Sequence, residues 1–270
     1  MLSNPLADIK TPMLKSFAQP ATLTTTAPGT ATWLPDSLQT LIQVLSQSRS
    51  LTPKQVKQYV LAANISATDL IPWATFSHSA ADSYGRQLVC QGRNFEVMVM
   101  SWNPGDYSAI HDHGGAQWGA VQCFGTAEHY TYSYNEGTLK TAAPAHYQPG
   151  MVREVDHDLI HQMGNAGTVP FLSLHVYGCP EQRQSITEDA RIFNLFERAI
   201  QYTDGGAFFC LPSDKVNHQS PGLTADVETT LRHHRQMRSR IVRTLATQSS
   251  TVLREALTQI NQDIAQLLRS

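Results

Sequence analysis

Between residues 86 and 178 the sequence is a series of short apolar runs, rich in Val, Phe, Tyr and Leu and separated by Gly, Pro, Asn and Asp. The runs are LVCQG, NFEVMVMSW, GAVQCFG, AEHYTYSY, MVREV and FLSLHVYG. Many short strands at regular spacing are typical of a β-sandwich or barrel. The stretch AEHYTYSYNEGTLKTA predicts a hairpin that is closed near Asn135-Glu136-Gly137. We therefore expect a mainly β fold, whose strand-rich part ends near Pro180.

Helical periodicity replaces the strand pattern on both sides of this region. In residues 36–64 apolar residues recur at steps of three and four, and Thr52 followed by Pro53 predicts the start of a second helix. Residues 222–270 are again predicted to be helical, with an apolar stripe from Leu253 to Leu267. The segments IFNLFERAI and GGAFFCL, which lie between, are predicted to form further strands or a helix–strand pair.

These patterns divide the chain into three parts. Residues 1–32 are rich in Thr, Ala and Pro towards their end, which predicts a flexible tail. Residues 33–212 are predicted to form one β-barrel domain that includes the N-terminal helices, and residues 222–270 a C-terminal helical extension. The helix of this extension that precedes the apolar stripe carries five arginines between residues 232 and 243 with only Glu228 opposing them, and we expect them to lie on a solvated face.

The composition excludes several classes of protein. A net charge of −2 argues against a dedicated nucleic-acid binder. No apolar run approaches the roughly 20 residues that span a bilayer, and no secretory signal is recognisable at the N-terminus. The four cysteines are spread without CxxC spacing, which favours free thiols in a reducing compartment. We expect a cytoplasmic, monomeric protein without nucleic-acid or membrane partners.

The sharpest local signal is His111-Asp112-His113, which follows the run NFEVMVMSW and a turn. In a strand, residues i and i+2 point to the same side. Both imidazoles are therefore predicted to project into one interior, where together they can bind a first-row metal ion. Two histidines at this spacing are a weak signal when they stand alone.

The surroundings of this pair strengthen the metal prediction. A glycine stands six residues before His111 and another twelve residues after His113, and a second segment contains Gly150, His161 and Asn165. This arrangement resembles the two sequence motifs of cupins. The resemblance implies a cupin β-barrel in which His111, His113 and His161 are the metal ligands.

Trp118 occupies the position at which the first cupin motif usually has a glutamate ligand. Because tryptophan cannot ligate a metal, the site is predicted to have three neutral imidazoles and no carboxylate. Such ligands leave the charge of a divalent ion uncompensated and several positions open, which favours an anionic substrate ligand such as a thiolate. Zinc remains an alternative to iron, since three histidines and water also form hydrolytic zinc sites.

A longer composite pattern is more specific than any of these parts. It consists of Tyr84-x-Arg86, the HxH pair, His161 and Ser173-Leu-His175-Val-Tyr177. This pattern resembles the type I cysteine dioxygenase family of thiol dioxygenases over roughly residues 70–180.

The resemblance implies a role for each matching residue. His111, His113 and His161 would be the Fe(II) ligands. Arg86 would pair with the substrate carboxylate beside Tyr84, as the guanidinium fork suits a carboxylate. Ser173, His175 and Tyr177 would form a relay that aims the Tyr177 hydroxyl at the iron site.

The implied reaction is oxidation of a small thiol carboxylate, L-cysteine, to its sulfinate by O2. Three alternatives stay open: a 3-mercaptopropionate dioxygenase, a non-catalytic metal-binding cupin that acts as a sensor through the Arg-rich helix, and a hydrolytic zinc enzyme. One departure from the animal members concerns their tyrosine-linked cysteine, because counting from His113 places Trp118 there, followed by Gly119. The link to Tyr177 is therefore predicted to be absent.

The remaining histidines match no motif position. We expect His129, His146 and His157 to be surface or hairpin residues.

Overall fold

The computed structural model describes residues 34–48, 50–79, 82–183 and 185–269. The predicted tail of residues 1–32 lies outside these described residues. The N-terminal helices are α1 (Asp36–Gln47), α2 (Pro53–Ala62), α3 (Ala67–Leu70) and the 3-10 turn η2 (Ile71–Trp73). The strands of the central region are β1 (Gly85–Gln91), β2 (Phe95–Trp102), β3 (Trp118–Cys123), β4 (Ala127–Asn135), β5 (Thr138–Tyr147), β6 (Val152–Asp156), β7 (Ile160–Gly164) and β8 (Phe171–Gly178). After them come β9 (Ala190–Asn194), β10 (Ala199–Thr203), the 3-10 turn η3 (Ser213–Lys215), β11 (His218–Pro221), β12 (Thr224–Ala225), α4 (Val227–Thr247) and α5 (Thr251–Leu267).

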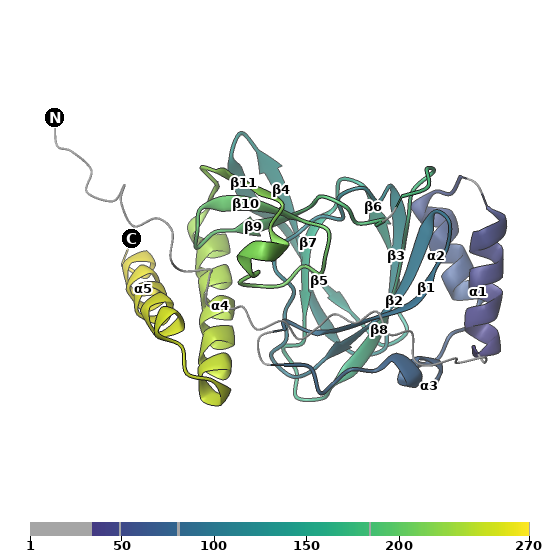
Figure 1. Cartoon of the computed structure of the whole chain (residues 1–270), viewed down its shortest axis with the longest axis horizontal. Coiled ribbons are helices and arrows are strands. Elements are labelled where there is room, and N and C mark those ends of the chain that lie inside the picture. Colours follow the sequence, from purple (N-terminus) through teal and green to yellow (C-terminus); the bar gives the residue numbers. More distant parts are fainter. Residues whose placement is uncertain (1–33, 49, 80–81, 184, 270) are drawn as a thin grey trace.

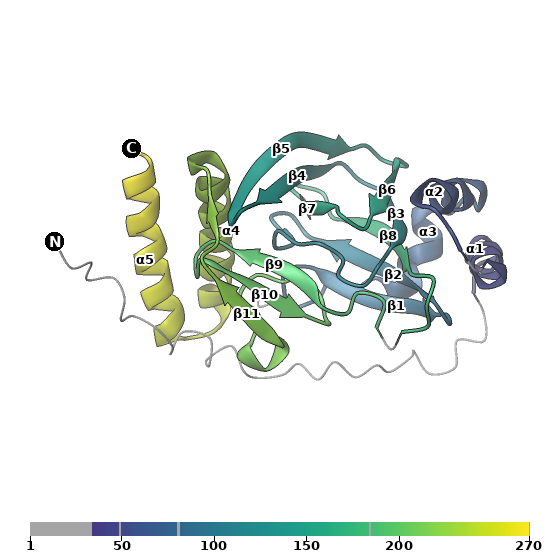
Figure 2. The same ribbon diagram turned by 90° about the horizontal axis from the view of Figure 1, so that it is seen from above.

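Within the described residues the strands form two facing sheets and a smaller third one. The five-stranded sheet has the order β1-β2-β8-β3-β6, and the four-stranded sheet the order β12-β5-β4-β7. The third sheet, β11-β10-β9, lies at the end nearer α4 (Figure 2). Helices α1–α3 and the pair α4–α5 flank the strands at opposite ends of the molecule (Figure 1). The predicted mainly β barrel with N-terminal helices and a C-terminal helical extension is confirmed.

Strand β8 shows how alternation separates two cores. Leu172, Leu174 and Val176 belong to the cluster that the five-stranded sheet makes with α1–α3. Tyr177 belongs instead to the cluster between the sheets. Because side chains alternate along a strand, Ser173 and His175 face the same interior as Tyr177. The outer face of this sheet therefore holds the helices, and its inner face carries the polar residues of the site.

Local sequence signals set several element boundaries as predicted. Thr52 caps α2 by accepting from the Gln55 N–H, and Pro53 follows at the first helical position. The β4–β5 hairpin turns at Glu136 and Gly137, which both have positive φ, as a tight hairpin turn requires.

The strand-rich region does not end near Pro180. The segment IFNLFERAI contributes to the hairpin of β9 and β10, while most of GGAFFCL is irregular. The bridge between His111 and Ile192 joins β9 to the segment that carries the histidine pair. The chain beyond Pro180 thus completes the barrel around the site.

The Arg-rich face of α4 is not uniformly solvated, contrary to the prediction. Arg240 is 5% exposed, and its guanidinium lies 3.6 Å from the buried Asp106 carboxylate. Arg243 lies 3.3 Å from the same carboxylate, and Arg232 stacks over the ring of Tyr130. The buried carboxylate of Asp106, far away in the sequence, turns Arg240 and Arg243 inwards, because a buried charge needs a partner. The boundary between a barrel domain and an extension at residues 212–222 stays a prediction. None of the helices described is long and apolar enough to cross a membrane.

Candidate metal centre

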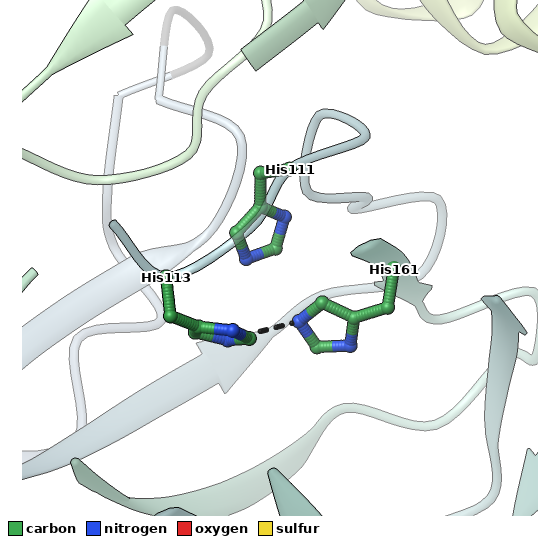
Figure 3. Close-up of side chains that lie close together, drawn as sticks. All are labelled: His111, His113 and His161. Atoms are coloured by element: carbon green, nitrogen blue, oxygen red, sulfur yellow. Dashed lines mark hydrogen bonds between the residues drawn. The ribbon is translucent and has the colours of Figure 1, made fainter. Parts of the chain in front are cut away.

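Three histidines lie close together (Figure 3), with His161 on the four-stranded sheet and His113 next to Tyr177 of the five-stranded sheet. His161 lies on β7, whereas His111 and His113 lie in the segment between β2 and β3, outside any regular strand, contrary to the strand expected there. The N–H of His111 donates to the carbonyl of His161 at 2.9 Å, and the N–H of His161 returns the bond at 2.8 Å. This reciprocal backbone pair fixes the two segments side by side. The spacing of two residues then brings His113 to the same side, as predicted.

The ring nitrogens have the spacing of ligands to one ion. One ring nitrogen of each histidine lies within 4.8 Å of those of the other two. The Nε2 atoms of His113 and His161 are 3.2 Å apart, a separation at which they form a hydrogen bond when one carries the proton (Figure 3). Two imidazoles bound to one metal at about 2.0–2.1 Å have nitrogens about 3.0–3.4 Å apart. The three residues therefore fit a shared metal ion.

Burial keeps these rings uncharged. It lowers the pKa of His111, and it lowers the pKa of His113 and His161 well below the ordinary value, with neighbouring imidazoles adding to the effect for the latter two. His111 Nδ1 lies 2.9 Å from the carbonyl oxygen of Ala109. A carbonyl only accepts, so this Nδ1 carries the proton and Nε2 keeps a free lone pair. A neutral imidazole with a free lone pair is the form that binds a metal.

In the part of the chain that the structure describes, the candidate ligand group contains histidines and no carboxylate. Asp112 stands between two of the ligands, but its carboxylate accepts from the side chain of Arg191 and from the Gly114 N–H. Trp118 packs in the cluster under the helices, on the opposite face of the sheet. The predicted set of three histidines is the group that the fold brings together.

The three polar residues of β8 form a hydrogen-bonded line beside this group. Ser173 Oγ lies 2.8 Å from His175 Nε2, and His175 Nδ1 lies 2.8 Å from the hydroxyl of Tyr177. The Tyr177 ring lies next to His113, with 4.7 Å between the ring centroids. Trp102, which the sequence did not single out, donates from Nε1 to Ser173 Oγ at 2.8 Å. The line therefore runs from Trp102 on β2 to Tyr177 at the histidines.

An indole N–H only donates, so Ser173 Oγ accepts from Trp102 and keeps its own proton to donate. One arrangement of protons that fits these contacts has Ser173 donating to His175 Nε2 and His175 donating from Nδ1 to Tyr177. The proton of the Tyr177 hydroxyl then remains available for a further acceptor. Burial lowers the pKa of His175 to about 3 and raises the pKa of Tyr177 well above its usual value, so both stay neutral near pH 7.

Tyr84 and Arg86 lie at the start of β1, close to the same interior. The Tyr84 ring stacks on Trp102 with 4.7 Å between centroids, and its hydroxyl accepts from the Ala207 N–H at 3.1 Å. Burial raises the pKa of Tyr84 to about 12, and the nearby charge of Arg86 opposes the shift. The charge of Arg86 also acts on His175 and Tyr177. Half-buried Arg86 has no ion pair with an acidic residue in the described ranges.

Among the remaining histidines, His129 lies on the β4 strand of the predicted hairpin, but it is not a surface residue. It is 4% exposed on β4, and its Nε2 lies 2.9 Å from Nδ1 of His161. Alternation along β4 could have indicated its burial, but only the pairing of β4 with β7 brings it to the ligand. His146 and His157 are exposed, as predicted.

The residue of β3 that pairs with Tyr177 is Gly119. It stands one position after Trp118, which counting from His113 gave as the counterpart of the cross-linking cysteine. Gly119 pairs with Tyr177 between β3 and β8, and a Cβ at Gly119 would lie 2.9 Å from the tyrosine ring. Counting from His113 could not fix this position, because the loop before β3 sets the strand register. A glycine therefore stands where a cross-linking side chain would have to lie.

Comparison with known proteins agrees with this geometry. Residues 30–186 match the family model described as cysteine dioxygenase type I. Cysteine dioxygenase type 1 of Homo sapiens is 27% identical over 164 residues, which cover 54% of this chain and 76% of the human protein. The protein of the same name from Danio rerio is 26% identical over 158 residues, covering 55% and 77% of the two chains.

Among solved structures, one match is a conserved Klebsiella pneumoniae protein with a double-stranded β-helix domain. It has a TM-score of 0.35 and 19% identity, and covers 44% of this chain and 93% of that one. A cupin 2 conserved barrel domain protein from Salinispora arenicola has a TM-score of 0.31 and 18% identity, and covers 39% and 85%.

The barrel and its three inward histidines define a cupin with a candidate metal centre. The match over residues 30–186 is more specific than that class. The chain belongs to the cysteine dioxygenase type I family.

Proposed function

We propose that this protein is a non-haem Fe(II) thiol dioxygenase that oxidises L-cysteine to cysteine sulfinate, adding both atoms of O2 to the sulfur. The observation that carries the proposal is the line from Ser173 through His175 to Tyr177, which ends against the ring of His113. A structural metal site has no need of a buried hydroxyl whose position is set by two further side chains. A dioxygenase centre needs such a group beside its open ligand positions.

The metal would be held by His111, His113 and His161, which are neutral and correctly spaced. Ferrous iron, when bound there, would supply the redox chemistry and the open positions at which a thiolate and O2 combine. Since the ligands carry no negative charge, they favour a substrate that brings its own.

The substrate carboxylate would bind to Arg86 and Tyr84. Arg86 is half-buried with no acidic partner in the described ranges, so its guanidinium is available for a carboxylate. The Tyr84 oxygen already accepts from the Ala207 N–H, which leaves its own proton free to donate to the same carboxylate. Two positively polarised groups on one side of the centre would orient the thiol towards the metal.

Tyr177 would hold a proton at its hydroxyl, facing the reacting atoms. In the arrangement of protons described above, His175 would donate to the Tyr177 oxygen, while Ser173 holds His175 and Trp102 holds Ser173. The raised pKa of Tyr177, caused by burial, keeps this hydroxyl protonated at neutral pH. It can therefore donate a hydrogen bond to negative charge that develops during oxidation.

The test is oxygen consumption by Fe(II)-loaded protein supplied with L-cysteine or with 3-mercaptopropionate. The proposal expects consumption with cysteine, its loss when iron is removed and its return when Fe(II) is added. If 3-mercaptopropionate is turned over faster than cysteine, it would be the substrate instead, and the reaction would still be that of a thiol dioxygenase. Iron-loaded protein that binds cysteine without consuming O2 would favour a non-catalytic metal-binding cupin, and activity with zinc alone would favour a hydrolase. A cytoplasmic location and a monomeric state stay predictions.

A further inference from the structure

His129 is the one buried histidine of β4, and it contacts a ligand without being a ligand itself. Its Nε2 lies 2.9 Å from Nδ1 of His161, with the ring planes at 72°. On its other side the ring lies edge-on to Tyr147 at 5.2 Å. Within the described residues, no hydrogen-bond partner reaches the buried Nδ1 of His129. Among the described residues, the side-chain hydrogen-bond contact of His129 is thus with the candidate ligand His161 alone.

The three candidate ligands are supported differently on the side away from the shared centre. His111 donates from Nδ1 to the carbonyl of Ala109. His113 Nδ1 is buried without a partner in the described part of the chain. Among these three, only His161 is held on this side by another imidazole in the described residues. That imidazole belongs to His129 and can either accept or donate the hydrogen bond.

The positions of the ring protons decide whether the His129 imidazole accepts a hydrogen bond from His161 or donates one to it. His161 Nε2 faces His113 Nε2 and is the atom that a metal would use. With Nε2 bound to a metal, the proton of neutral His161 must reside on Nδ1, and it must be donated to His129 Nε2. His129 then carries its own proton on Nδ1. Without a metal, the reverse arrangement satisfies the same hydrogen bond, with His129 donating.

We propose that His129 is a positioning residue, which fixes the proton-bearing form and the ring orientation of His161 by accepting its Nδ1 proton. This inference rests on the three-histidine metal centre of the proposed function. A partner that accepts from the outer nitrogen of a ligand histidine orients its ring and raises its basicity. Losing such a partner typically lowers metal affinity about 10- to 100-fold.

The test compares His129→Gln with His129→Leu. A glutamine can present its amide oxygen as an acceptor near the position of Nε2, whereas leucine fills the space without any acceptor. Co(II) and Fe(II) affinities are measured by competition with a chelator, together with the Co(II) absorption spectrum. The expected result is a loss of about 10- to 100-fold in affinity for His129→Leu, with most of it restored in His129→Gln. His146→Leu, the same change at an exposed position on the neighbouring β5, is the matched control and should bind as the unmodified protein does.

Each other outcome overturns the inference in a recognisable way. Equal metal affinity of His129→Leu and the unmodified protein would show that the contact has no role in binding. Equal losses in both variants would assign His129 to packing alone. If the unmodified protein itself binds no metal, the proposed centre is wrong, which is a different failure and is visible before any variant is made.

A second measurement needs no variant and therefore does not depend on its folding. The imidazole nitrogens of the unmodified protein are observed by NMR after Zn(II) loading, with histidine labelled with nitrogen-15. The proposal expects His129 to be protonated at Nδ1 and unprotonated at Nε2 in the loaded form. A proton on His129 Nε2 in that form would contradict it.

Discussion

Arg86 stands on β1, where its charge reaches Tyr84, His175 and Tyr177. Among the described residues it makes no hydrogen bond or ring contact with the three candidate ligands, His111, His113 and His161. We expect Arg86→Ala to raise KM for cysteine by about 10- to 100-fold, since hydrogen bonds to a charged group contribute about 1.5–3 kcal/mol. Iron content should change little. The measurement is steady-state oxygen consumption, with metal analysis of the same samples.

Arg235→Ala is the matched control, because Arg235 is exposed on α4. Its KM should equal that of the unmodified protein. An unchanged KM in Arg86→Ala would remove Arg86 from the substrate site, and a parallel loss of iron would assign it to the structure of the metal centre instead.

At the residue scale, the sequence could predict what depends on local spacing. His111 and His113 share a side because they are two residues apart, and Ser173, His175 and Tyr177 share a face for the same reason. Contacts that depend on which strands pair could not be predicted in this way. The bond from His129 to His161 and the approach of Gly119 to Tyr177 both follow from strand register.

At the scale of elements, Asp106 joins helix α4 to the turn that leads into the histidine pair. Its carboxylate contacts His78 at 2.9 Å, Arg243 at 3.3 Å and Arg240 at 3.6 Å, and it is 1% exposed. Arg243 also donates to the carbonyl of Pro104 in the same turn. The C-terminal extension is therefore tied to the segment that positions the candidate ligands.

We expect Asp106→Asn to lower the free energy of unfolding by about 3–5 kcal/mol, because it leaves a buried guanidinium without its counter-charge. Urea unfolding at pH 7 measures the change. Glu154→Gln is the control, since it removes one partner of the exposed Lys57–Glu154 pair and should cost less than about 1 kcal/mol. Equal effects of the two substitutions would show that the Asp106 cluster does not hold the helix in place.

This cluster also shows why the solvated face predicted for α4 was wrong. Arg240 and Arg243 of α4 are separated from their partner Asp106 by more than a hundred residues. Helical periodicity locates the apolar stripe of a helix, but it does not reveal a buried carboxylate supplied by a distant turn.

At the scale of the whole molecule, buried neutral histidines make stability depend on pH. Burial lowers the pKa of His233 to about 3, with His234 adding to the shift, whereas the same ring in the unfolded chain keeps a pKa near 6.5. Below pH 6.5 the unfolded state therefore binds a proton that the folded state does not. Stability from this residue is present above pH 6.5 and is lost as the pH falls towards 3.

We expect His233→Gln to flatten this dependence. The free energy of unfolding should fall between pH 6.5 and pH 5 less steeply than in the unmodified protein, by about 1.4 kcal/mol per pH unit for one proton. Urea unfolding at several pH values measures both slopes, and exposed His157→Gln should behave as the unmodified protein does. Identical slopes for His233→Gln and the unmodified protein would show that His233 is not held neutral in the fold.

The account depends most on the claim that the centre adds O2 to a thiol. The direct measurement is mass spectrometry of the product formed from L-cysteine by the Fe(II)-loaded protein under oxygen labelled with oxygen-18. The account predicts cysteine sulfinate in which both sulfinate oxygens carry the label. A sulfinate with one labelled oxygen or none, or cystine as the only product, would contradict it.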